Sequence, residues 1–142
     1  MRINKINVLR WIAAVVVGTF VGSLIIYAFQ ALGQVVFPPP FEYDPANPDI
    51  FRKLDSAGRV TVLVPILVSY LAGALIAGFL AGIISRGTNL TASAITGLVL
   101  LLFGLVNLIN FYHPLWFWIA SLPAWPTMAL AGGILSSRAK RK

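Results

Sequence analysis

Three stretches of the chain contain no charged residue, and each is long enough to cross a membrane as a helix. They run between Arg10 and Glu42, between Arg59 and Arg86, and between Arg86 and Arg138. A bilayer core about 30 Å thick is spanned by roughly 20 apolar residues in helical conformation. A helix also pairs its backbone N–H and C=O groups within the segment, which hydrocarbon requires. The pattern therefore predicts membrane-spanning helices.

The third stretch is too long for one span and divides at His113 and Pro114, because proline can open a new helix and disfavours the helical state of the residue before it. We therefore expect an all-α fold, a bundle of four transmembrane helices in a single membrane domain over residues 1–142. The short links after the second and third spans favour antiparallel neighbours. The expected spans cover residues 11–36, 60–85, 90–111 and 114–135, with an extracytoplasmic loop over residues 37–59.

The positive charges indicate how the spans are oriented. The chain has 11 Lys and Arg residues, and eight of them lie before the first span, between the second and third spans, or after the last. All four acidic residues lie in the loop 37–59. The positive-inside rule then places both termini in the cytoplasm. Because the cations flank apolar spans instead of forming a face on a polar domain, we expect no nucleic-acid partner.

The loop 37–59 is predicted to begin in an extended conformation and to contain a short helix. Prolines at positions 38–40 favour a polyproline II exit from the first span. Asn47 can cap a helix that begins at Pro48, and Gly58 lies beyond its expected end. We expect this short helix to lie at the outer membrane interface or over the mouth of the bundle.

Small residues recur at helical spacing along the predicted spans. Lipid tails are as apolar as leucine, so membrane helices associate through close packing at small side chains. This spacing fits contacts within one chain as well as contacts between copies. Prolines at 65, 123 and 126 are expected to bend their helices. The predicted helix-packing residues are Gly18, Gly22, Ala74, Gly78, Gly82, Gly97 and Gly104.

The residue types present give little support to catalysis. The chain has no cysteine and one histidine, which excludes disulfides, thiolate chemistry and zinc sites built from cysteine or several histidines. No charged residue falls within a predicted span, so a proton-driven carrier is not expected. No nucleophile with a base and an orienting group is recognisable. We expect a protein that is not an enzyme and has no cofactor, metal site or catalytic residue.

Five polar residues fall near the outer ends of the predicted spans. Unpaired amides in apolar surroundings cost about 1–3 kcal/mol each. Such residues either bond to one another across the helices, or line a pocket for a small solute, a lipid head group or a cation. The five candidate ligand-binding residues are Gln30, Gln34, Asn107, Asn110 and His113.

A basic tail follows the last span and is a candidate lipid-binding site. Each cation near an anionic membrane surface is worth about 1 kcal/mol. Membrane lipids are therefore expected partners. The tail contains Arg138, Lys140, Arg141 and Lys142.

Four segments resemble a family of small, uncharacterised bacterial four-helix membrane proteins. They are residues 31–40 (ALGQVVFPPP), 44–48 (DPANP), 70–82 (YLAGALIAGFLAG) and 107–119 (NLINFYHPLWFWI). Members of that family have four spans, a proline-rich stretch after the first and an HPLWFW-like segment opening the last. The resemblance covers most of the chain and implies a bacterial inner-membrane protein with that architecture. Members carry Glu and His where this chain has Gln30 and Gln34, so a titratable or metal-binding site is not expected there.

Two functions fit these observations. The first is a non-enzymatic accessory or scaffold subunit that uses its small-residue helix faces and outer loop for contact, as a homo-oligomer or in a larger membrane complex. The alternative is a passive pathway or binding site for a small solute, lipid head group or cation, lined by the outer-leaflet amides and the histidine.

Overall fold

The computed structural model describes residues 5–38, 44, 47–54, 56–86 and 90–139, which form helices and no strand. Of these helices, α1, α3, α4 and α5 are each long and apolar enough to cross a membrane. The helices are α1 (Lys5–Val36), α2 (Pro48–Lys53), α3 (Ser56–Ser85), α4 (Thr91–Asn110) and α5 (Leu115–Ala139).

Three of the long helices extend beyond the predicted spans. α1 begins at Lys5 and α3 at Ser56, while α5 continues to Ala139. The predicted limits followed the apolar runs. A helix can continue through polar residues beyond such a run, until its backbone hydrogen bonds end. Gly58 follows α2 as predicted, but it lies inside the first turn of α3 and not in a loop. A single glycine costs a helix only about 1 kcal/mol relative to alanine, so it does not end one by itself.

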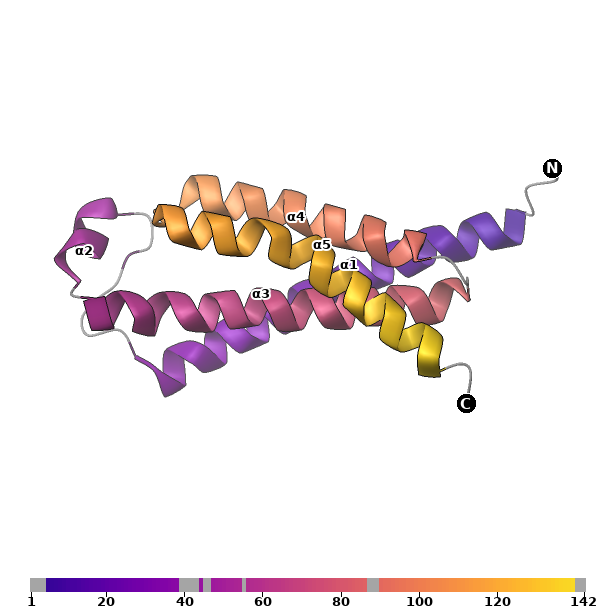
Figure 1. Cartoon of the computed structure of the whole chain (residues 1–142), viewed down its shortest axis with the longest axis horizontal. Helices are drawn as coiled ribbons and strands as arrows, with labels where there is room; N and C mark the ends of the chain where they lie inside the picture. The colour runs from indigo at the N-terminus through magenta and orange to yellow at the C-terminus, as the bar shows by residue number, and fades with distance from the viewer. Residues whose placement is uncertain (1–4, 39–43, 45–46, 55, 87–89, 140–142) are drawn as a thin grey trace.

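The four long helices form a bundle in which α3 contacts α1, α4 and α5, and α4 contacts α1 and α5 (Figure 1). Consecutive long helices run in opposite directions. The start of α1 and the end of α5 therefore lie at one end of the bundle, and α2 lies at the other.

Glycines bring α3 close to α1 and α5. A Cβ atom built on Gly22 would lie 2.7 Å from the Ala77 Cβ, and one built on Gly18 would lie 2.8 Å from the Ala77 carbonyl oxygen. Against α5, a Cβ on Gly78 would overlap the backbone of Ala129. These contacts leave no room for side chains, as expected where membrane helices pack through their backbones.

Small residues also fit α4 against α5. A Cβ on Gly97 would lie 2.8 Å from the Ala129 Cβ. One on Gly104 would lie 2.7 Å from the Trp125 ring, so the absence of a side chain at 104 makes room for the indole.

All the predicted packing residues lie at contacts within the chain. Gly82 lies against Ser136 of α5, and Ala74 is fully buried in the core. The small-residue faces are therefore covered by the protein's own helices. The set comprises Gly18, Gly22, Ala74, Gly78, Gly82, Gly97 and Gly104.

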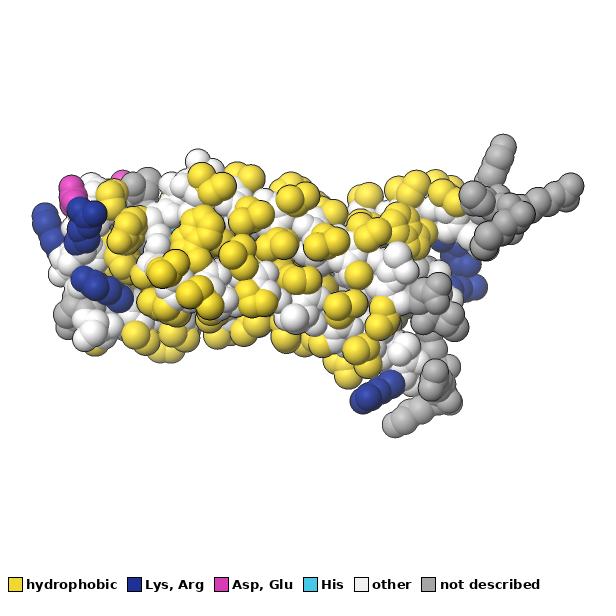
Figure 2. All heavy atoms as spheres, turned by 45° about the horizontal axis from the view of Figure 1, so that its top comes forward, with side chains coloured by type: hydrophobic (Ala, Val, Ile, Leu, Met, Phe, Trp, Pro, Cys, Tyr) yellow, Lys and Arg dark blue, Asp and Glu magenta, His cyan; other side chains and the backbone are white. Residues whose placement is uncertain are grey.

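The face of the bundle shown in Figure 2 is apolar between two ends that carry charge. Large hydrophobic side chains point outward on every long helix, and Tyr27 and Ile109 are each 73% exposed. A soluble bundle buries one apolar stripe of each helix and turns polar side chains to water. An apolar outer surface on four long apolar helices is typical of a multi-pass membrane protein.

α2 covers the end of the bundle. Asn47 caps it, since the Asn47 side chain accepts a hydrogen bond of 3.0 Å from the Asp49 backbone N–H, and Pro48 occupies the first turn. Phe51 and Leu54 are each 3% exposed and belong to the hydrophobic core. The apolar face of α2 is therefore buried against the bundle.

Arg59 of α3 holds the C-terminal end of α2 in place. Its guanidinium donates to the backbone oxygens of Leu54 at 3.0 Å and Arg52 at 3.1 Å. It also lies 5.6 Å from the centroid of the Phe51 ring. Of the prolines predicted to leave α1 in an extended conformation, residue 38 is described and is not helical, while Pro39 and Pro40 lie outside the described residues.

Candidate functional site

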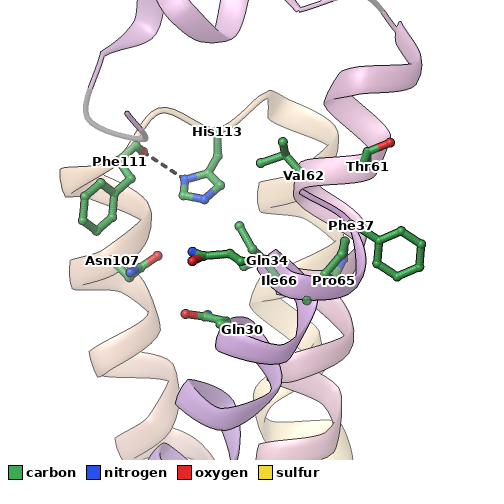
Figure 3. Close-up of a pocket in the computed structure, with 11 residues that line it drawn as sticks. Gln30, Gln34, Phe37, Thr61, Val62, Pro65, Ile66, Asn107, Phe111 and His113 are labelled. Atoms are coloured by element: carbon green, nitrogen blue, oxygen red, sulfur yellow. Dashed lines mark hydrogen bonds between the residues drawn. The ribbon is translucent and has the colours of Figure 1, made fainter. Parts of the chain in front are cut away.

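A pocket of about 330 Å³ lies at the α2 end of the bundle, lined by α1, α3, α4 and the segment that joins α4 to α5 (Figure 3). Lower in the bundle α1 and α4 contact each other, and a Cβ on Gly22 would lie 3.5 Å from the Leu100 side chain. The pocket opens between these two helices about two turns further along. Its volume is at the lower end of the range of about 300–1,000 Å³ for ligand pockets.

Gln30 and Gln34 bring two amides to the α1 wall of the pocket. They lie one turn apart, and both side chains reach toward α4 (Figure 3). Gln30 is half-buried and Gln34 is exposed. Neither amide is hydrogen-bonded to a described residue. Their donors and acceptors are therefore not used in contacts between the helices.

Asn107 faces these amides from α4 and is fixed by a bond to the core. Its Oδ1 accepts a hydrogen bond of 2.8 Å from the Tyr70 hydroxyl. Tyr70 is 2% exposed, and its ring centroid lies 4.3 Å from that of Trp125. Tyr70 was not among the predicted site residues. The sequence feature that marks it is a tyrosine in the middle of an apolar span, where the phenol hydroxyl needs a hydrogen-bond partner.

His113 lies above the amides, between α4 and α5. Its Nδ1 donates to the Phe111 carbonyl oxygen at 2.9 Å, and its ring stacks on Phe117 with centroids 4.7 Å apart. Burial lowers the pKa of His113, and the backbone carbonyls of Phe111 and Leu108 oppose that shift. The imidazole is therefore neutral at pH 7, where the ordinary pKa already favours the neutral form.

The remaining predicted candidates lie elsewhere. Asn110 does not line the pocket: it is exposed, and its Nδ2 donates to the Val106 carbonyl oxygen one turn earlier at 2.7 Å. This back-bond satisfies the amide locally, as is common for asparagine at a helix end. In the basic tail, Arg138 lies in the last turn of α5. The rest of the tail, Lys140, Arg141 and Lys142, lies outside the described residues.

Pro65 shapes the α3 wall. A Cβ on Gly33 of α1 would lie 2.8 Å from the Pro65 Cβ, so the end of α1 rests directly on the proline ring. Proline has no N–H, and the carbonyl of Thr61 four residues earlier therefore lacks its usual helical donor. Thr61 and Pro65 both line the pocket.

The pocket lining carries no formal charge among the described residues. None of its eleven residues is Asp, Glu, Lys or Arg. The described part of the chain also contains no group of three metal-ligating side chains. The other walls are apolar and include Phe37, Val62, Ile66 and Phe111. Such a pocket can hold an uncharged polar group by hydrogen bonds while apolar atoms lie along its walls.

Comparison with protein-family models, with curated proteins and with solved structures finds no match. Function must therefore be inferred from the pocket and the surface of this chain.

Proposed function

We propose that this chain is a multi-pass membrane protein that binds a small polar ligand in the pocket at the α2 end. The supporting observation is that α1, α4 and the segment after α4 direct uncharged polar side chains to one pocket. The amides on α1 have no described protein partner, although unpaired amides in apolar surroundings cost about 1–3 kcal/mol each. A ligand would offset that cost. The proposed binding residues are Gln30, Gln34, Asn107 and His113.

The distribution of charge supports an orientation with both chain ends in the cytoplasm. Eight of the 11 Lys and Arg residues lie up to Arg10, at Arg86 or from Arg138 onward in the sequence. The other three, Arg52, Lys53 and Arg59, lie with the four acidic residues between Val36 and Val60. The positive-inside rule then makes the α2 end external. α2 lies at the outer interface and the pocket in the outer leaflet. The bacterial inner membrane is proposed from the resemblance of the HPLWFW-like segment.

Close packing below the pocket favours binding over passage. A Cβ on Gly18 would lie 3.3 Å from the Thr96 side chain, and one on Gly22, a turn later, would lie 3.5 Å from the Leu100 side chain. A solute in the pocket therefore meets packed helices on the cytoplasmic side. We propose a binding site in place of a passive pathway.

A role as a scaffold or accessory subunit stays a prediction, and only the exposed apolar side chains support it. Because the small-residue faces are covered within the chain, a homo-oligomer or larger complex would form through exposed apolar side chains. On α1 these include Phe20 and Tyr27.

Crystals grown from phospholipid bicelles test the proposed function. We expect the wild-type protein to show density that neither protein nor water explains, within hydrogen-bonding distance of Gln30 or Gln34. The double variant Gln30→Leu, Gln34→Leu should lose this density. Asn110→Leu is the matched control, because Asn110 lies outside the pocket, and it should keep the density. A wild-type pocket that holds only water, or amides bonded across it to Asn107, would contradict the proposal.

A further inference from the structure

We propose that the pocket binds an uncharged, hydroxyl-bearing group, such as the glycerol moiety of a neutral lipid, whose hydroxyl donates to Nε2 of His113. This inference rests on the proposed function and specifies its ligand class.

The hydrogen bond at Nδ1 determines what His113 offers. A carbonyl oxygen can only accept, so the bond of 2.9 Å to the Phe111 oxygen requires the proton on Nδ1. In the neutral ring Nε2 then carries a lone pair. Figure 3 shows this second ring nitrogen pointing into the pocket, toward the level of Gln34. The imidazole is therefore an acceptor for a ligand that donates.

The amides on α1 complement this acceptor. Each glutamine amide has an NH₂ group that donates and an oxygen that accepts. Since neither Gln30 nor Gln34 is bonded to a described residue, both can orient to suit a ligand. A hydroxyl donates one hydrogen bond and accepts others, so it can bond to Nε2 and to an amide NH₂ at once.

The absence of charge from the described lining disfavours ionic ligands. An anion would face the lone pairs of His113 Nε2 and Asn107 Oδ1 without a Lys or Arg among the eleven lining residues. A cation would find no Asp or Glu among them. Either ion would give up water without a counter-charge, which costs far more than the burial of a neutral hydroxyl.

The position of the pocket favours a lipid as the source of the hydroxyl. Gln34 and Gln30 lie two and six residues before the end of α1, which is about 3 and 9 Å along the helix axis. This depth corresponds to the interface and the first part of the hydrocarbon when the helix ends lie at the membrane surface. The apolar walls formed by Val62, Ile66 and Phe111 suit an acyl chain that continues from the polar group.

Labelling with ¹⁵N-histidine gives a direct test, because His113 is the one histidine in the chain. The full-length protein in phosphatidylcholine nanodiscs should show Nδ1 as a protonated nitrogen and Nε2 as an unprotonated one at neutral pH. Addition of monooleoylglycerol should then shift the Nε2 resonance in a saturable way. Oleate and oleylamine, which carry the same chain with an anionic or cationic head, should not. Free glycerol should produce the same shift only at much higher concentration.

Two variants separate binding from structure. His113→Phe keeps a ring that stacks on Phe117 but removes the acceptor, and loss of one hydrogen bond should weaken monooleoylglycerol binding about tenfold. The glutamine side-chain amide resonances report binding in this variant. Asn110→Leu, outside the pocket, should leave the affinity unchanged.

The possible results distinguish the ligand class from the proposed function. If a charged probe saturates the pocket and monooleoylglycerol does not, the ligand class is wrong and the binding function stands. If no probe shifts Nε2, or if Nε2 is protonated at neutral pH, the inference is overturned, while the bicelle crystals decide the binding function separately. If glycerol binds as tightly as monooleoylglycerol, the hydroxyl chemistry is supported and a free polyol replaces the lipid as its source.

Discussion

Replacement of Gly78 by alanine is expected to destabilise the bundle by about 1–3 kcal/mol, and replacement by leucine to exceed that range. A Cβ at position 78 overlaps the backbone of Ala129 on α5. Backbone atoms cannot rotate away as a side chain does, so α3 and α5 must separate. Separation also exposes the glycine contacts of both helices to lipid. Unfolding in mixed micelles, followed by circular dichroism as the fraction of denaturing detergent rises, measures the loss.

Val68→Leu is the control for this series. Val68 lies on the same helix and is 44% exposed, so a larger side chain there meets lipid and should leave the unfolding midpoint unchanged. A Gly78→Leu variant that is as stable as wild type but no longer forms an oligomer would contradict the packing of the glycine faces within one chain. Those faces would then pack between chains.

Replacement of Gln30 and Gln34 by leucine is expected to stabilise the ligand-free protein by about 1 kcal/mol. The half-buried Gln30 amide has no described partner, so an apolar side chain removes a desolvation cost without breaking a bond. Most of the gain should come from Gln30, since Gln34 is exposed. The same change should remove ligand binding, which is the usual conflict between stability and function. The same detergent unfolding measures the gain.

Asn107→Leu should act in the opposite direction and destabilise the protein by about 1–3 kcal/mol, because the buried Tyr70 hydroxyl would lose its acceptor. Tyr70→Phe in the Asn107→Leu background should recover much of that loss, since it removes the orphaned hydroxyl. If the glutamine variants proved less stable than wild type, their amides would serve as contacts between helices, as the alternative interpretation holds.

The helices were predictable because their signal is physical and local. A run without charge between Arg59 and Arg86 leaves few alternatives to an apolar helix, and Asn47 before Pro48 is a cap that functions without tertiary contacts. The start of α3 at Ser56 was not predictable in this way. Ser56 and the next three residues precede the apolar run that set the predicted limit, so the pattern did not include them.

The pocket residues were predictable only in part. Polar side chains near the ends of apolar spans need hydrogen-bond partners, and this requirement identified Gln30, Gln34, Asn107 and His113. Asn110 satisfied the same criterion, but its amide bonds to the carbonyl of Val106 in its own helix. Sequence spacing does not distinguish an asparagine that bonds to its own helix from one that bonds to another.

Labelling of single cysteines tests most directly the claim that apolar helices cross the membrane and place the α2 end outside. The chain contains no cysteine, so Asp44→Cys and Ser137→Cys each create one reporter, at opposite ends of the bundle. In sealed, right-side-out vesicles, a membrane-impermeant maleimide should label the Asp44→Cys variant at once and the Ser137→Cys variant only after lysis. Labelling of both variants from the same side, or of Ser137→Cys alone in sealed vesicles, would contradict the account.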